Sequence, residues 1–230
     1  MATLQHIING KKVTGTSSTV FDIYNPSTGQ KINKMQGASA ADTKQAIDAA
    51  ETAFESWKKV PPSKRAQIMF NYRELLYKNV EELAELISIE HGKTLADAKG
   101  EVMRGVEVVE FCTAINSHLK SDYTADVSAN IDSYNLRQPL GVCTGITPFN
   151  FPAMVPMWMY PVAIACGNTF VLKLSERVPS CGLRLAELMS EAGLPDGVFN
   201  VVVGDKEAVD ELLHNPKVCA ISFVGSTSVG

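Results

Sequence analysis

Hydrophobic positions in the first 140 residues follow two different periods. HIINGKKV places Asn9-Gly10 between two short apolar runs, and residues 20–32 repeat this style around a second turn. Asn-Gly supplies the positive φ angles of a type I′ turn, so both segments are typical of β-hairpins. From Ala40 the period becomes 3.6, which predicts helices at 40–57, 63–78, 80–90 and 93–119, with a break at Gly92.

From Gly141 onward, short runs rich in Val, Ile and Phe alternate with amphipathic stretches. The apolar runs are 141–146, 169–174, 198–203 and 218–224, and helical patterns lie between them at 151–166, 179–192 and 205–214. Continuous apolar strands separated by amphipathic helices are typical of a parallel sheet covered on both faces. The sequence therefore predicts an α/β fold with a doubly wound parallel sheet.

Residues 123–139 (YTADVSANIDSYNLRQP) alternate polar and apolar positions around a polar centre. This pattern predicts a two-stranded ribbon that reaches into solvent. Because the segment interrupts the helical part on one side and the strand–helix units on the other, we expect residues 1–122 and 140–230 to form one domain. The ribbon at 123–139 is then an excursion used for oligomerisation.

Composition and charge exclude several classes of protein. The chain has 25 acidic and 21 basic residues and a net charge of −4, which favours neither nucleic acid nor an anionic membrane as a partner. No charge occurs from Gln138 to Leu172, but prolines and asparagines interrupt this stretch, so it is expected to be a buried core segment and not a membrane span. The start lacks an Arg-rich amphipathic segment, which favours the cytoplasm.

Cysteines and histidines offer no evident chemistry in the sequence. The five cysteines are widely spaced without a CxxC pair, which fits neither a disulfide framework nor a zinc site. Cys143, Cys166 and Cys219 lie in apolar segments, where a thiol is expected to be buried packing and not a nucleophile. The four histidines, His6, His91, His118 and His214, have no visible acidic or metal partner. We therefore expect no metal site.

Chemistry is expected beyond the carboxyl ends of the strands, where ligands bind in doubly wound sheets. After 141–146, Asn150 stands between Pro148 and Pro152 at the entrance to a predicted helix. One interpretation is a helix N-cap. The other is a preorganised amide that donates to a developing oxyanion.

Two further strand ends carry polar residues. Lys173, Glu176 and Arg177 follow 169–174, where a carboxylate commonly binds the ribose hydroxyls of a dinucleotide, although a surface charge cluster would look the same. Gly225 and Ser226 follow 218–224, in a setting where backbone amides can meet a phosphate. The Gly225-Ser226 segment is not the full GxGxxG fingerprint and is a weak signal by itself. The three strand-end sites together are stronger evidence than any one of them, because all fall at the same edge of one sheet.

The sequence motifs of the chain resemble those of a known family. GVCTGITPFNFP, followed by AIACGNTFVLK, Ser175-Glu176 and FVGSTSVG at 223–230, is similar to the NAD(P)-dependent aldehyde dehydrogenase superfamily. The run ITPFNFPAMVPMWMYPVAIACGNTFVLKLSERVPS resembles its CoA-acylating branch, the methylmalonate-semialdehyde dehydrogenases. The resemblance covers the whole chain. Leu174 departs from the family's usual Pro, and Met159 stands where many relatives have Lys.

The resemblance implies roles for the residues at matching positions. Asn150 matches the oxyanion-hole Asn, and Arg104 matches an Arg that this branch uses toward the substrate carboxylate; without the resemblance, Arg104 is equally typical of a helix surface. The implied cofactor contacts are Thr147 and Phe149 near the nicotinamide, Lys173, Glu176 and Arg177 near the adenosine ribose, and Gly225 and Ser226 at the pyrophosphate.

The implied parent enzyme oxidises a (methyl)malonate-type semialdehyde with NAD through a thiolate, and CoA takes the acyl group. The family's catalytic Cys and catalytic domain fall beyond Gly230. We therefore expect 1–122 and 140–230 to form an NAD-binding domain that is incomplete at its C-terminus, and this chain alone to be inactive. The alternatives are a non-acylating semialdehyde dehydrogenase and a dinucleotide-binding module without catalysis. Expected partners are the small semialdehyde, CoA and further copies of the chain in a dimer or tetramer.

Overall fold

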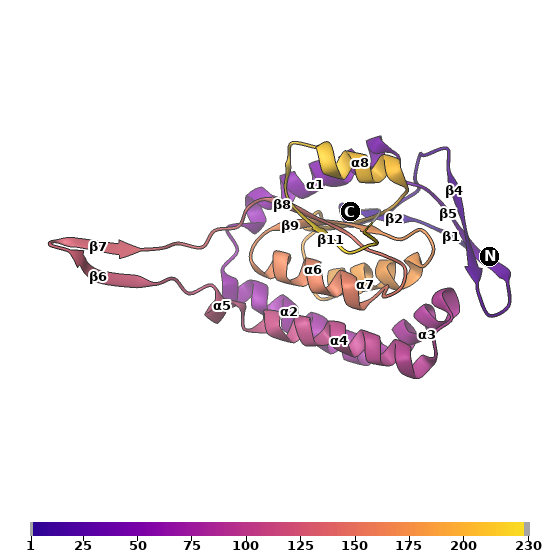
Figure 1. Cartoon of the computed structure of the whole chain (residues 1–230), viewed down its shortest axis with the longest axis horizontal. Helices are drawn as coiled ribbons and strands as arrows, with labels where there is room; N and C mark the ends of the chain where they lie inside the picture. Colours follow the sequence, from indigo (N-terminus) through magenta and orange to yellow (C-terminus); the bar gives the residue numbers. More distant parts are fainter. Residues whose placement is uncertain (1, 228–230) are drawn as a thin grey trace.

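A central six-stranded sheet organises the protein, whose computed structural model describes residues 2–227 (Figure 1). The strand order is β11-β8-β9-β10-β2-β3; the first four strands are parallel, and β2 is antiparallel to both β10 and β3. The bounds are β2 His6–Ile8, β3 Lys11–Val13, β8 Val142–Ile146, β9 Thr169–Leu174, β10 Phe199–Val203 and β11 Val218–Phe223. The predicted α/β class with a doubly wound parallel sheet is confirmed.

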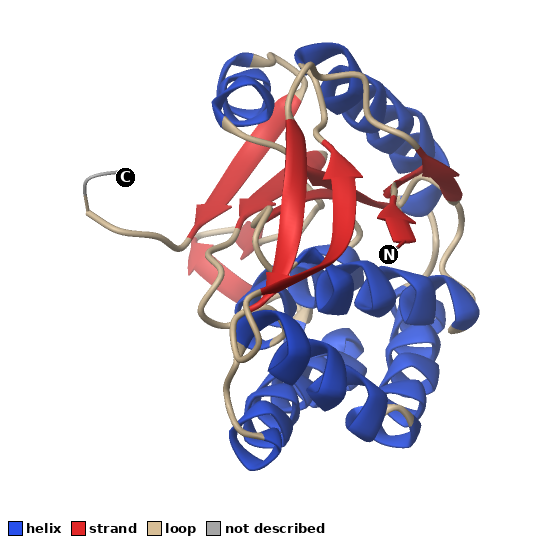
Figure 2. Cartoon of the chain, turned by 90° about the vertical axis from the view of Figure 1, so that its right-hand side faces the viewer, coloured by secondary structure: helices blue, strands red, loops and turns tan. Residues whose placement is uncertain are grey.

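Helices cover both faces of this sheet in layers (Figure 2). One face contacts α1 and α8, the other contacts α6 and α7, and α2, α3 and α4 form an outer layer over α6 and α7. The bounds are α1 Ala40–Trp57, α2 Pro62–Lys78, α3 Val80–His91, α4 Leu95–Thr113, α5 Ile115–His118, α6 Met154–Ala165, α7 Pro179–Glu191 and α8 Lys206–His214. Apolar faces at helical spacing thus meet strands that are buried on both sides.

Aromatic packing joins three of these layers. Tyr160 of α6 stacks on Phe199 of β10 with ring centroids 4.4 Å apart, and Phe170 of β9 completes the group. The Tyr160 hydroxyl is hydrogen-bonded to the Tyr72 hydroxyl of α2. The outer layer is therefore anchored to the sheet through α6, the helix that follows the candidate Asn150.

The N-terminal strands are distributed over two sheets. Asn9 and Gly10 have φ angles of 52° and 71°, as the predicted I′ turn requires. The sequence did not predict that this hairpin extends the main sheet, where the Asn9 amide donates to Asn200 Oδ1 at 2.8 Å. A separate three-stranded sheet has the order β1-β5-β4, with bounds β1 Ala2–Leu4, β4 Val20–Asn25 and β5 Gln30–Gln36.

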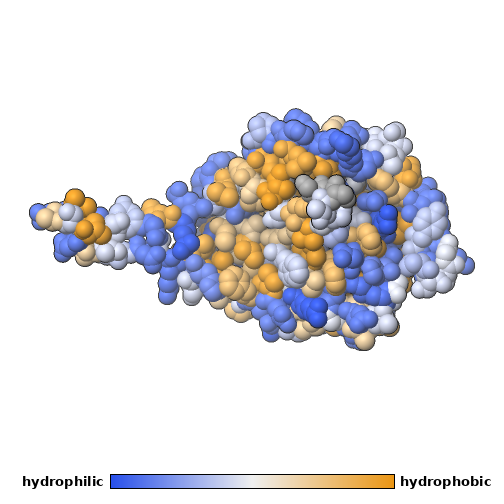
Figure 3. All heavy atoms as spheres, in the orientation of Figure 1, coloured by the Kyte–Doolittle hydropathy of each residue, from blue (hydrophilic) through white to orange (hydrophobic). Residues whose placement is uncertain are grey.

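The predicted ribbon is present and projects from the body of the molecule (Figure 1). It consists of β6 (Tyr123–Ser128) and β7 (Ile131–Tyr134), and every residue of both strands is exposed. Apolar side chains lie among polar ones along it (Figure 3).

Two helices begin later than the sequence predicts. Helix α4 begins at Leu95 and not at 93, because Thr94 caps it by accepting from the Asp97 amide at 3.1 Å, and this leaves Lys93 outside the helix. The helix ends at Thr113 and not at 119, and the short helix α5 follows it. Helix α6 begins at Met154 and not at 151, with Ala153 at its N-cap, whose own side chain makes no capping bond. Both corrections change the surroundings of Asn150.

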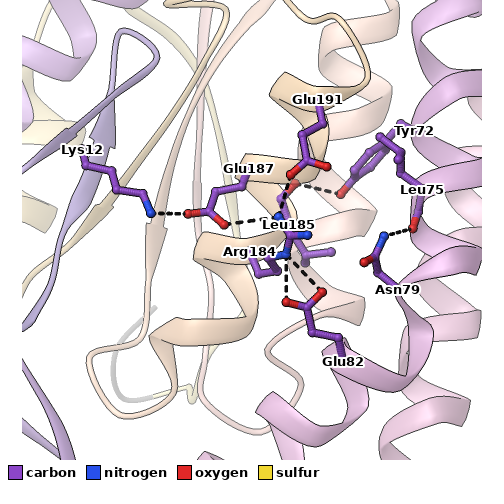
Figure 4. A network of polar contacts seen from close by, with 9 residues as sticks. All are labelled: Lys12, Tyr72, Leu75, Asn79, Glu82, Arg184, Leu185, Glu187 and Glu191. Atoms are coloured by element: carbon purple, nitrogen blue, oxygen red, sulfur yellow. Dashed lines mark hydrogen bonds and ion pairs between the residues drawn. The ribbon is translucent and has the colours of Figure 1, made fainter. Parts of the chain in front are cut away.

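Charged side chains tie α7 to its neighbours (Figure 4). The Arg184 guanidinium donates to Glu82 of α3 at 3.0 Å and to Glu191 at 2.7 Å, and Glu187 pairs with Lys12 of β3 at 2.7 Å. Glu187 and Glu191 thus take part in a network of ion pairs across the α3–α7–β3 contact.

The uncharged stretch from Gln138 to Leu172 lies largely in the core, where it forms β8, α6 and part of β9. Among residues 2–227, no helix combines the length and the apolar character needed to cross a bilayer.

Candidate active site

A cleft of about 550 Å³ opens at the carboxyl ends of β8, β9 and β11. It is lined by six of the sequence-predicted residues, Thr147, Phe149, Lys173, Glu176, Gly225 and Ser226. Val209 and Leu213 of α8 add an apolar wall, and apolar side chains gather around this end of the chain (Figure 3). Residue 230, the second glycine of the 223–230 motif, lies outside the described residues.

Lys173 and Thr147 are held together at the floor of the cleft. The Thr147 amide donates to the Lys173 carbonyl oxygen at 3.2 Å, which continues the β8–β9 pairing past the strand end. The Lys173 side chain is nearly buried, and this burial lowers the pKa of its ammonium although Glu176 and Asp205 raise it. The cleft thus holds a partly desolvated cation on a rigid strand.

Glu176 lies between two cations at the rim of the cleft. Its carboxylate oxygens are 3.9 Å from Lys173 Nζ and 4.0 Å from Arg177 Nε. Arg177 does not line the cleft itself; its guanidinium lies 5.0 Å from the centroid of the Phe149 ring. The His91 ring lies on the same side chain, with ring centroids 6.5 Å apart, so Phe149 has two neighbours although it is 45% exposed.

A second cleft of about 580 Å³ lies beside the first, between α4 and the loop that joins β8 to α6. Asn150 and Arg104, which are far apart in sequence, both line it. Within residues 2–227 no hydrogen bond to the Asn150 side-chain amide and no ion pair of Arg104 are recorded. An amide donor and a cation are therefore available to the same small space.

Asn150 is not a helix cap. The first amides of α6, those of Ala153 and Met154, donate to Oε1 of Glu101 at 2.8 and 3.2 Å. Asn150 contributes its backbone oxygen to a bond from Lys93 Nζ at 3.0 Å. The N-cap interpretation is thus wrong, because a carboxylate from α4 occupies the capping role.

Sequence reasoning missed three residues around the second cleft, namely Lys93, Glu101 and His91. His91 was expected to have no role, yet it stacks near Phe149. Burial lowers its pKa, with Lys93 also lowering it. One signal was present in the sequence: Glu101 precedes Arg104 by three residues, which places both on one side of α4.

Four of the five cysteines are unsuited to act as nucleophiles. Burial raises the pKa of the Cys112 thiol to about 12 and that of Cys143 to about 11, and it also raises the pKa values of Cys166 and Cys181. Cys219 differs from the expected buried packing, because it is exposed on β11. It does not line either cleft.

Comparison with known proteins identifies the family to which the chain is similar. The sequence profile of the aldehyde dehydrogenase family matches residues 12–230. A Pseudomonas aeruginosa protein named malonate-semialdehyde dehydrogenase is 56% identical over 229 residues, which cover 100% of this chain and 46% of that protein. A Dictyostelium discoideum protein, named a probable acylating, mitochondrial methylmalonate-semialdehyde/malonate-semialdehyde dehydrogenase, is 48% identical over 99% of this chain and 43% of that protein.

Comparison with solved structures gives matches in the same family. The crystal structure of a Sinorhizobium meliloti protein complexed with NAD superposes with a TM-score of 0.96 at 52% identity, over 99% of this chain and 46% of that one. This chain therefore spans about half the length of the relatives it matches.

Proposed function

Because the chain belongs to the aldehyde dehydrogenase family, we propose that it supplies the NAD-binding part and the oxyanion-stabilising Asn of a malonate- or methylmalonate-semialdehyde dehydrogenase. One observation carries the proposal: Phe149 and Asn150, consecutive residues, line two adjacent clefts. A cofactor in the first cleft and an aldehyde in the second would meet at this loop. We refer to the enzyme of which this chain would be the N-terminal half as the complete enzyme.

The residues of the first cleft fit a dinucleotide. Glu176 offers carboxylate oxygens to ribose hydroxyls at the end of β9, and the Lys173 ammonium lies 3.9 Å from that carboxylate, close enough to bind the same hydroxyls. Gly225 and Ser226 present the backbone after β11 to a pyrophosphate, and the α8 wall is apolar enough for an adenine. NAD, when bound, accepts the hydride from the aldehyde carbon. Phe149 would contact its nicotinamide half.

The residues of the second cleft fit a small aldehyde that carries a carboxylate. Arg104 has no ion pair within residues 2–227, so its guanidinium can bind the substrate carboxylate in two parallel hydrogen bonds. The Asn150 amide then donates to the aldehyde oxygen as negative charge develops there. We place the thiol nucleophile in the half of the relatives that this chain does not span.

CoA is proposed as the acceptor of the acyl group. The support is the word acylating in the name of the Dictyostelium relative. Product analysis with and without CoA tests this point. Formation of the free acid at the same rate in both cases would favour the non-acylating alternative.

The ribbon at 123–139 is proposed to mediate assembly of a homo-oligomer. It exposes Tyr123, Ile131, Tyr134 and Leu136, and it is too thin to bury them within one chain. The five free thiols fit a reducing compartment, for which we propose the cytoplasm. The mitochondrial Dictyostelium relative provides the alternative location.

Substitution of Asn150 tests the proposed chemistry. In the complete enzyme, Asn150→Ala should lower kcat by about 10²–10³-fold, because removal of one oxyanion donor has this effect elsewhere. The Kd for NAD should stay within about twofold, since the cofactor cleft is lined by other residues. NADH formation from malonate semialdehyde measures the first quantity and calorimetric titration the second. An unchanged kcat would leave only the dinucleotide-binding module.

A further inference from the structure

The loop between β8 and α6 is fastened on both sides of Asn150 by two charged residues of the α3–α4 segment. Lys93 follows α3, and Glu101 lies in α4. Neither is a predicted contact of substrate or cofactor. Both nevertheless lie against the second cleft beside Asn150.

Glu101 fixes the side of the loop that enters α6. Its side chain is only 1% exposed, and its Oε1 accepts from the amides of Ala153 and Met154. These amides begin the helix and have no partner within it, so the carboxylate satisfies them and meets the positive end of the helix dipole. The start of α6, three residues after Asn150, is thereby tied to α4.

Lys93 fixes Asn150 itself. Its ammonium lies 2.5 Å from Glu101 Oε2, 3.0 Å from the Asn150 carbonyl oxygen and 4.4 Å from the centroid of the Phe151 ring. Its side chain is 12% exposed, and its charge is matched by Glu101. The cation is therefore committed to the loop, whereas Arg104 in the same cleft has no ion pair within residues 2–227.

We propose that Lys93 and Glu101 are positioning residues that fix the backbone from which the Asn150 amide extends toward the reacting aldehyde oxygen. This inference rests on the proposed function of Asn150. The two residues hold the backbone at Asn150 and at the start of the following helix, so the point from which the exposed Asn150 side chain extends is fixed relative to α4. A displacement of about 1 Å at a reacting centre can cost on the order of 10²-fold in rate.

Substitution of Lys93 provides the first measurement. In the complete enzyme, Lys93→Met keeps the length and most of the packing of the side chain but cannot donate to Asn150. We expect kcat to fall by about ten- to hundredfold while the Kd for NAD changes by less than about twofold. Lys93→Arg, which can still bridge Glu101 and the Asn150 carbonyl, should recover part of the rate.

Lys99→Met is the matched control. Lys99 lies on the same helix as Glu101, and its ion pair with Glu81 is exposed. This variant should leave kcat unchanged. An equal loss of kcat in Lys99→Met and Lys93→Met would overturn the proposal, since it would reflect a general effect of removing a charge near α4.

A double-mutant cycle with Asn150→Ala separates positioning from a structural role. If Lys93 acts through Asn150, then Lys93→Met should cause no further loss of kcat in the Asn150→Ala background. A full additional loss there would overturn the inference and leave the function of Asn150 intact. If Asn150→Ala alone has no effect on kcat, the proposed function fails and this inference fails with it.

Glu101→Gln tests the second residue without removing the cap. The amide keeps an oxygen that can accept from Ala153 and Met154 but loses the charge that holds Lys93. We expect kcat to fall by about tenfold at an unfolding midpoint close to that of the unsubstituted enzyme. An unchanged kcat would show that Glu101 acts only as a cap and would remove it from the proposal.

Discussion

Lys173 Nζ and Glu176 Oε2 lie 3.9 Å apart in the cleft proposed to bind the cofactor, so a cation and an anion would face the same ribose hydroxyl. The lysine is nearly buried and the carboxylate is about one-third exposed. A ribose 2′-hydroxyl can bind to both groups. A 2′-phosphate would be attracted by one and repelled by the other.

We expect the carboxylate to dominate and the complete enzyme to prefer NAD over NADP. Direct hydrogen bonds to the ribose hydroxyls favour NAD, and like-charge contact in a partly desolvated cleft disfavours the phosphate. Glu176→Gln should therefore raise KM for NAD and lower KM for NADP. The ratio of kcat/KM for NAD to kcat/KM for NADP should fall by about tenfold or more. An unchanged ratio would assign the adenosine site to Lys173 alone.

Arg104 should set the requirement for a carboxylate on the substrate. Arg104→Met should raise KM for malonate semialdehyde by about 10–100-fold, which corresponds to the loss of one charged hydrogen-bonding group. Propionaldehyde, which lacks the carboxylate, serves as the control and should show the same KM in both proteins. A parallel rise for both aldehydes would mean that Arg104 supports the cleft and does not bind the substrate.

Local patterns in the sequence were sufficient for the elements of the sheet but not for the contacts around Asn150. The Val- and Ile-rich runs predicted the parallel strands to within about one residue, because burial on both faces leaves a continuous apolar signal. The Asn9-Gly10 turn was equally local. Pairing of its hairpin with β10 depends on contacts such as the Val203 amide with His6 Nδ1, which are separated by 197 residues.

The candidate site was predictable where it lay at strand ends and not where it came from the helical part. Thr147, Lys173 and Glu176 follow strands whose neighbours are fixed by the parallel order. Lys93 appeared to be a helical residue, and only the cap at Thr94 frees it to reach the Asn150 carbonyl. The residue that caps α6 likewise depends on the tertiary structure, since Glu101 lies 52 residues before Ala153.

The ribbon should control the oligomeric state of the complete enzyme. Leu136 is 71% exposed beside β7, so Leu136→Asp should not lower the free energy of unfolding of the isolated chain. In the proposed interface between copies, the same substitution would bury a charge. We expect a larger dissociated fraction in sedimentation velocity. Val20→Asp, at a β4 position that is 51% exposed, is the matched control and should not change the distribution. Identical distributions for all three proteins would contradict a role of this residue in assembly.

His6 should make the stability of the fold depend on pH. The side chain is fully buried on β2, and its Nδ1 accepts from the Val203 amide at 3.2 Å, which requires the neutral ring. Burial lowers the pKa of His6 from 6.5 to about 4, although Asp42 and a backbone contact raise it in part. The native state therefore binds this proton less readily than the unfolded chain does.

The sign follows from that difference. Stabilisation by the neutral ring is complete above pH 6.5 and is lost progressively as the pH falls toward 4, because the unfolded chain takes up the proton first. At pH 5 this group lowers the free energy of unfolding by on the order of 2 kcal/mol relative to pH 8.

His6→Asn keeps an oxygen that can accept from the Val203 amide but does not titrate. Urea unfolding at both pH values should show a free energy of unfolding that falls by about 2 kcal/mol more in the unsubstituted chain than in the variant. Equal losses in the two proteins would mean that His6 is protonated with the same pKa in the folded and unfolded states.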